Sequence, residues 1–140
     1  MRIGMLGLGL FVLVCGCGGA PKPQEGLKPV TGKVTYKGQP LTKGAITFVA
    51  TDRKGTGAMG LINDKGEYTL KSDVNSPGAR PGKYKVRVES WQTEPGMGGG
   101  KVTAGKSAIP EKYMATESSG LEATVKDQSE PQAIDFDLKD

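Results

Sequence analysis

Apolar and polar residues alternate with a period of two through most of the chain after residue 28. The alternation occupies seven segments, at residues 30–36, 46–49, 59–61, 68–70, 84–88, 121–125 and 134–138. Tyr84, Val86 and Val88, for example, alternate with charged residues. A strand with one buried face and one wet face produces this pattern. Seven such segments, with almost no helical periodicity, predict an all-β fold, a β-sandwich of about seven strands.

Turn residues separate these segments. The letters NDKG at residues 63–66 predict a tight hairpin, with Met59 and Leu61 as the apolar positions before the turn and Tyr68 and Leu70 as those after it.

Two longer connections interrupt the alternation, at residues 72–82 and 92–107. The second contains three consecutive glycines and has almost no apolar residues after Trp91. This composition predicts a mobile loop.

The first twenty residues follow a different pattern. Met1 and Arg2 precede an unbroken apolar and glycine-containing run at 3–14, which ends in the letters VCGC at 14–17. A positive start, a short apolar core and a small-residue exit are typical of a secretory signal peptide. The run is too short for a membrane span, which needs about 20 residues. We therefore expect residues 1–16 to be removed on export.

The exit of this leader resembles the lipobox of bacterial lipoproteins. Val14 stands at its aliphatic position, Gly16 at its small position and Cys17 at its lipidated position. Cys15 departs from the pattern, which more often has Ala, Ser or Thr there. The resemblance implies that Cys17 becomes the acylated first residue of the mature chain and holds it in a bilayer through acyl chains such as palmitate.

The mature chain then divides into two parts. Residues 17–27 comprise the lipidated cysteine and a small, polar, proline-containing stretch, GGAPKPQEGL, which predicts a flexible tether. Its ten residues after the cysteine, when fully extended, reach roughly 33–36 Å. Residues 28–140 have the size of one domain.

The composition excludes several kinds of catalytic and metal site. The chain has no histidine, which removes the commonest general base, the Ser-His-Asp and Cys-His arrangements and every His-containing zinc site.

Loss of Arg2 with the leader lowers the 19 basic residues to 18 against 15 acidic ones, so the net charge falls from +4 to +3. This mild, dispersed excess does not favour nucleic-acid binding. Cys17 is the only thiol left, so no internal disulfide is expected. We expect no metal, cofactor or catalytic residue.

The domain contains a series of short motifs. They are PVTGKVTYKGQPL at 29–41, GAITF at 44–48, GEYTL at 66–70, PGKYKV at 81–86, IPEKY at 109–113, SGL at 119–121 and DFDL at 135–138. In this order they resemble carboxypeptidase regulatory-like domains of the transthyretin (prealbumin-like) type, over nearly all of residues 28–139. The chain is similar to small bacterial lipoproteins of unassigned activity that contain such domains. The resemblance implies a Greek-key sandwich and brings no catalytic residues with it.

Together these features predict a lipid-anchored, non-catalytic binding or structural adaptor module of the bacterial cell envelope, on the periplasmic or surface face of a membrane. Trp91, the only tryptophan, lies at a strand end beside the glycine-rich segment. It either caps the sandwich edge or, with Gln92 and Arg87, contacts an envelope glycan or protein partner. The alternative function is a secreted hydrolase or accessory domain that acts on envelope glycans through carboxylates such as Asp135 and Asp137.

Overall fold

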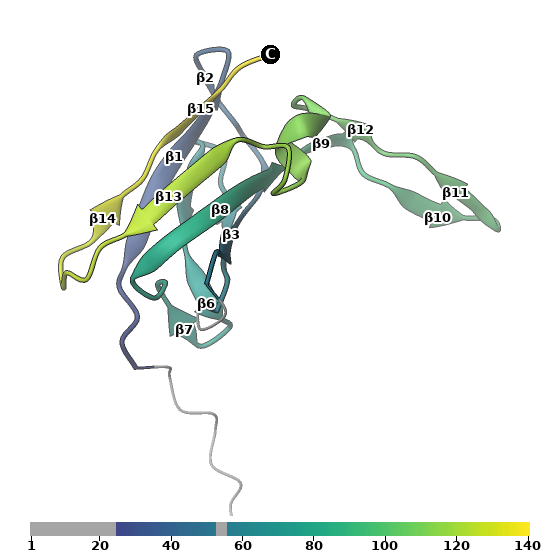
Figure 1. The fold of residues 1–140 in the computed structure, drawn as a ribbon. Coiled ribbons are helices and arrows are strands. Elements are labelled where there is room, and N and C mark those ends of the chain that lie inside the picture. Colours follow the sequence, from purple (N-terminus) through teal and green to yellow (C-terminus); the bar gives the residue numbers. More distant parts are fainter. Residues whose placement is uncertain (1–24, 53–55) are drawn as a thin grey trace, which may run out of the picture.

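The computed structural model describes residues 25–52 and 56–140 (Figure 1). The predicted leader, Cys17 and most of the predicted tether lie outside the described residues. The elements are β1 (Val30–Tyr36), β2 (Gln39–Pro40), β3 (Gly44–Ala50), β4 (Ala58–Ile62), β5 (Glu67–Thr69), β6 (Lys71–Asp73), β7 (Ser76–Pro77), β8 (Gly82–Glu89), β9 (Trp91–Thr93), β10 (Gly96–Gly98), β11 (Lys101–Thr103), β12 (Lys106–Ser107), the 3₁₀ helix η1 (Glu111–Met114), β13 (Leu121–Val125), β14 (Gln132–Ala133) and β15 (Phe136–Leu138). No helix in these two ranges is long and apolar enough to cross a membrane.

Two sheets form the body of the domain. The larger has six strands in the order β13-β8-β3-β4-β6-β7, and all of its pairings are antiparallel. In the other, β1 pairs in parallel with β14 and β15 and antiparallel with β2 and β5. Each of the seven predicted segments contains strand residues. The predicted all-β, sandwich-like class is confirmed.

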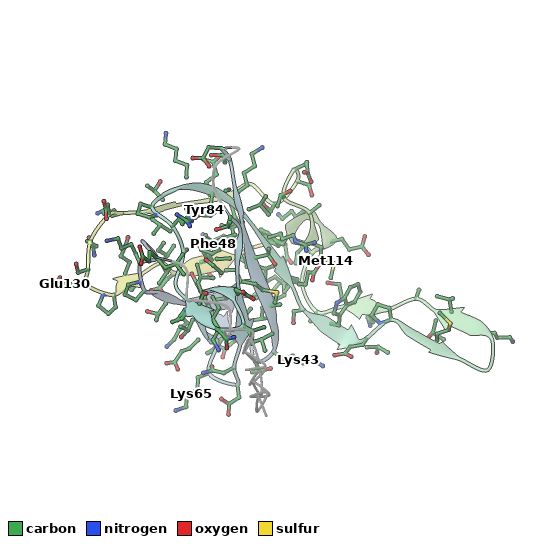
Figure 2. The ribbon with its side chains drawn as sticks, turned by 90° about the horizontal axis from the view of Figure 1, so that it is seen from below. Lys43, Phe48, Lys65, Tyr84, Met114 and Glu130 are labelled. Carbon is green, nitrogen blue, oxygen red and sulfur yellow. The ribbon has the colours of Figure 1, made fainter. Side chains whose placement is uncertain are left out.

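An aromatic cluster joins the two sheets. The ring of Phe48 on β3 has its centroid 5.8 Å from that of Tyr84 on β8, 6.3 Å from that of Tyr68 on β5 and 6.0 Å from that of Phe136 on β15. Figure 2 shows the labelled Phe48 and Tyr84 close together in the centre of the body. Fully buried aliphatic side chains surround the cluster: Val30, Val34, Ile46, Leu70, Val86, Val88 and Leu138. Since burial of such side chains is the main force for folding, this is the centre of the domain's stability.

Tyr68 also provides a polar contact between strands. Its hydroxyl donates a hydrogen bond to the backbone carbonyl of Ile134, beside Gly32 of β1. Burial raises the pKa of Tyr68 far above its usual value, and the nearby Asp135 carboxylate adds to the shift. The hydroxyl therefore stays protonated and available as a donor at every physiological pH.

The turn at residues 63–66 forms, but the predicted hairpin does not. Gly66 has a φ of +80° and its N–H donates to the Asn63 carbonyl at 3.0 Å, as a tight turn requires. The strands on either side belong to different sheets, because β4 pairs with β3 and β6 whereas β5 pairs with β1. The turn therefore connects β4 of the larger sheet to β5 of the other sheet.

The predicted parity of β4 is wrong. Met59 and Leu61 are 52% and 74% exposed, whereas Ala58, Gly60 and Ile62 face the core. A Cβ at Gly60 would lie 2.9 Å from the Thr69 carbonyl oxygen and 3.2 Å from the Tyr68 ring. A larger side chain does not fit at position 60, so the face of β4 that contains Gly60 is turned inward and Met59 and Leu61 face solvent.

The predicted loop at 92–107 is instead part of a β-hairpin arm that projects from the body (Figure 1). At its base β9 pairs with β12, and further out β10 pairs with β11. Gly99 and Gly100, with φ of +59° and +77°, form its two-residue turn. Two consecutive positive φ values are characteristic of a type I′ hairpin, for which Gly-Gly is a favoured sequence. We define the arm as residues 91–107.

Candidate functional site

The predicted contact residues lie where the six-stranded sheet continues into the arm. Arg87 is near the end of β8, and Trp91 and Gln92 begin β9. Between them Ser90 is buried, and its hydroxyl donates to the Lys43 carbonyl at 2.7 Å. The N–H of Ala108 donates to the Ser90 carbonyl at 2.9 Å. Both ends of the arm are thus fixed to the body by backbone carbonyls.

These three residues differ in exposure and in their partners. Gln92 is exposed, whereas Trp91 and Arg87 are half-buried. The Nη1 atom of Arg87 donates to Glu89 Oε1 at 3.0 Å, so a neighbour on the same strand balances its charge. No cation–π contact joins Arg87 to the Trp91 ring in the part of the chain that the structure describes. The structure therefore places Trp91 and Gln92 on the arm and Arg87 on the sheet.

Tryptophan fluorescence tests the placement of Trp91, because no other tryptophan contributes to the signal. We expect acrylamide to quench the emission to an extent intermediate between that of free indole and that of a buried ring, since the side chain is half-buried at the base of the arm. Emission from the urea-unfolded chain provides the fully accessible reference. A blue-shifted signal that acrylamide does not quench would exclude Trp91 as a contact residue.

The carboxylates of the alternative hydrolase function have structural partners. Asp135 Oδ1 accepts a hydrogen bond from the Lys33 backbone N–H at 2.8 Å, and Asp137 Oδ1 accepts one from the Thr35 hydroxyl at 2.9 Å. Both bonds link the C-terminal segment to β1, close to the parallel pairing of β1 with β15. Over residues 25–52 and 56–140, no three His, Cys, Asp or Glu side chains are grouped so that they could hold a metal ion.

A second surface, which the sequence analysis missed, is an apolar groove lined by residues of β3, β4, β5 and β6. It has a volume of about 850 Å³ and extends to Val74, which follows β6. Its exposed apolar residues are Val49, Met59, Leu61 and Val74. Glu67, Lys71 and Asp73 are the charged residues that line it. The signal for it was the pair of small residues at 58 and 60, which leaves Met59 and Leu61 on the exposed face of β4.

The arm exposes a second apolar surface. Met97 and Val102 are 83% and 77% exposed, and they are Cα partners in the β10–β11 pairing. Directly opposite residues of an antiparallel pair lie on the same face, so the two side chains form one apolar face of the ribbon. Among the described residues, the exposed large hydrophobic side chains all belong to the groove or to the arm.

Comparison with known proteins adds little to these observations. No protein-family model matches the chain, and no curated protein matches its sequence. Among solved structures it is similar to a 9R-lipoxygenase from Cyanothece PCC8801, with 13% identity and a TM-score of 0.43. The similarity covers 86% of this chain and 17% of the length of the lipoxygenase.

Proposed function

We propose that this protein is an exported lipoprotein of the bacterial cell envelope, anchored through acylated Cys17. In this proposal its sandwich, of the carboxypeptidase regulatory-like, transthyretin type, is a non-catalytic binding or adaptor module on the periplasmic or surface face of a membrane. The main support is the order of the parts: an export-type leader, a cysteine at its exit, and a folded domain after a short tether.

The start of the folded domain fits such a tether. Lys28 is held by two backbone hydrogen bonds with Ala79, one of 2.8 Å and one of 2.9 Å. These bonds precede β1, so the domain is fixed from Lys28 onward. A chain that starts at Cys17 would thus hold the sandwich at most about 40 Å from its anchor.

The number of acyl chains determines how firmly the protein is held. Each buried methylene contributes about 0.8 kcal/mol, and a single chain gives only marginal, reversible attachment. The resemblance to lipoproteins implies a diacylglycerol in thioether linkage to Cys17, and thus two chains. Attachment through two acyl chains is stable, so the module does not dissociate from the membrane.

Two surfaces support a binding function. Both the groove and the arm expose apolar side chains to water. An isolated two-stranded ribbon is marginally stable in water, so the outer part of the arm would gain stability from a partner. Trp91 and Gln92 at its base add an amphipathic ring and an amide, which suit an envelope glycan or a protein partner.

Metabolic labelling with an alkyne analogue of palmitate tests the anchor. We expect the wild-type protein to incorporate the label and Cys17→Ser to lose it completely, because the serine side chain cannot form the thioether. Cys15→Ala is the matched control, since it makes the motif more typical of lipoproteins and should keep the label. Equal labelling of Cys17→Ser and wild type would refute the proposed attachment site.

A further inference from the structure

The groove and the arm both expose apolar side chains, the first in a cavity and the second on a projecting ribbon. The groove is concave, with Met59 and Leu61 on its floor strand, and the arm is a narrow ribbon with Met97 and Val102 on one face. Large exposed apolar patches on a soluble domain mark interaction sites. The groove can therefore accept the apolar face of an arm.

The arm cannot fill the groove of its own molecule in this fold. Both views show the arm leading away from the body (Figures 1 and 2). The groove lies over β3 and β4 and beside β6, within the body itself. An arm that occupies a groove therefore belongs to another copy of the chain.

The charges of the two surfaces are complementary. The arm carries Lys101 and Lys106 against a single acidic residue, Glu94, whereas the groove carries Glu67 and Asp73 against a single basic residue, Lys71. Neither arm lysine forms an ion pair within residues 25–52 and 56–140. The arm thus has a net positive charge and the groove a net negative charge. These charges favour a contact between an arm and a groove over a contact between two arms or two grooves.

We propose that two copies of this protein associate by placing the arm of each in the groove of the other. The inference rests on the proposed role of the arm and the groove as binding surfaces, and not on lipid attachment. A reciprocal exchange buries both apolar surfaces of each copy and closes with two-fold symmetry, so assembly stops at a dimer. A shared membrane would favour it further, because confinement of the copies raises their effective concentration.

Disulfide trapping tests this arrangement in the full chain in its own membrane. Acylation consumes Cys17, so the mature chain has no other thiol to compete. Each arm variant, Met97→Cys or Val102→Cys, is co-expressed with each groove variant, Met59→Cys or Leu61→Cys, and the membranes are treated with copper phenanthroline. A bond requires Cα atoms within about 4.4–6.8 Å of each other. We expect at least one of the four combinations to form a covalent dimer.

The control replaces the groove cysteine with Thr124→Cys, which is exposed on β13 of the same sheet outside the groove. An arm–groove pair should give at least about tenfold more dimer than this control pair, because contact raises the effective concentration of the two thiols. A thiol left free at Cys17 would give a crosslinked dimer of the chain that carries no introduced cysteine, so failure of the anchor is recognised separately.

Three results would overturn the exchange. In the first, none of the four pairs exceeds the control. In the second, an arm variant expressed alone crosslinks to itself as strongly as any arm–groove pair, which indicates contact between two arms. In the third, the arm cysteines are protected from a water-soluble maleimide by membranes and give no trapped dimer, which indicates that the arm contacts lipid.

Discussion

Gly32→Ala is expected to lower the free energy of unfolding by about 3 kcal/mol or more. A Cβ at this position of β1 would clash with the Ile134 carbonyl oxygen and lie 2.7 Å from the Tyr68 hydroxyl. The backbone cannot easily yield, since the Ile134 N–H is itself bonded to the Thr31 carbonyl at 2.9 Å. The substitution therefore separates the C-terminal segment from β1, or removes the hydrogen bond of Tyr68, or both.

Urea unfolding of the wild-type and variant chains measures this effect. Gly98→Ala is the matched control, because a Cβ there meets nothing within 4 Å and Gly98 does not have a positive φ. We expect the control to stay within about 0.5 kcal/mol of wild type. Equal stability of Gly32→Ala and Gly98→Ala would show that β1 and the C-terminal segment are not as closely packed as described.

Phe48→Ala is expected to cost about 3–5 kcal/mol, the usual range for removal of a buried phenylalanine. Its ring is fully buried and contacts rings from three other strands, two of which belong to the opposite sheet. The cavity cannot be filled without moving both sheets. Typical domains have only about 5–15 kcal/mol of stability, and residues 28–140 contain no cysteine that could form a disulfide within the domain. Phe48→Ala therefore removes a large part of the stability of the domain.

The control for Phe48→Ala is Leu61→Ala, which removes a large apolar side chain that is 74% exposed. Thermal unfolding followed by circular dichroism compares the two. At a protein concentration too low for the proposed dimer to form, Leu61→Ala should unfold close to wild type, whereas Phe48→Ala should unfold at a much lower temperature. A larger loss for Leu61→Ala than for Phe48→Ala would mean that β4 has its Met59 and Leu61 face toward the core.

The strands could be predicted because alternation depends only on residues close in sequence. In β8 and β15 the apolar parity coincides with the buried face. Strand pairing could not be predicted in the same way, because it depends on distant residues. The parallel pairing of Val34 with Phe136 joins opposite ends of the domain, and no local pattern indicates it.

The functional surfaces show the same limit. The position of Trp91 at a strand end could be predicted from alternation, whereas the groove depends on the contact of Gly60 with Tyr68 and Thr69 across a corner between sheets. The arm was missed for a different reason. Consecutive glycines occur both in flexible segments and in tight turns. Here Met97 and Val102, at matching distances from the Gly-Gly pair, are the local signal of a hairpin.

Anchoring of the sandwich through Cys17 is tested most directly by tandem mass spectrometry of the N-terminal peptide of the protein purified from membranes. We expect this peptide to begin at Cys17 and to carry a diacylglycerol on Sγ, with residues 1–16 absent. A peptide that retains the leader, or that begins with an unmodified Cys17, would contradict the proposed lipoprotein.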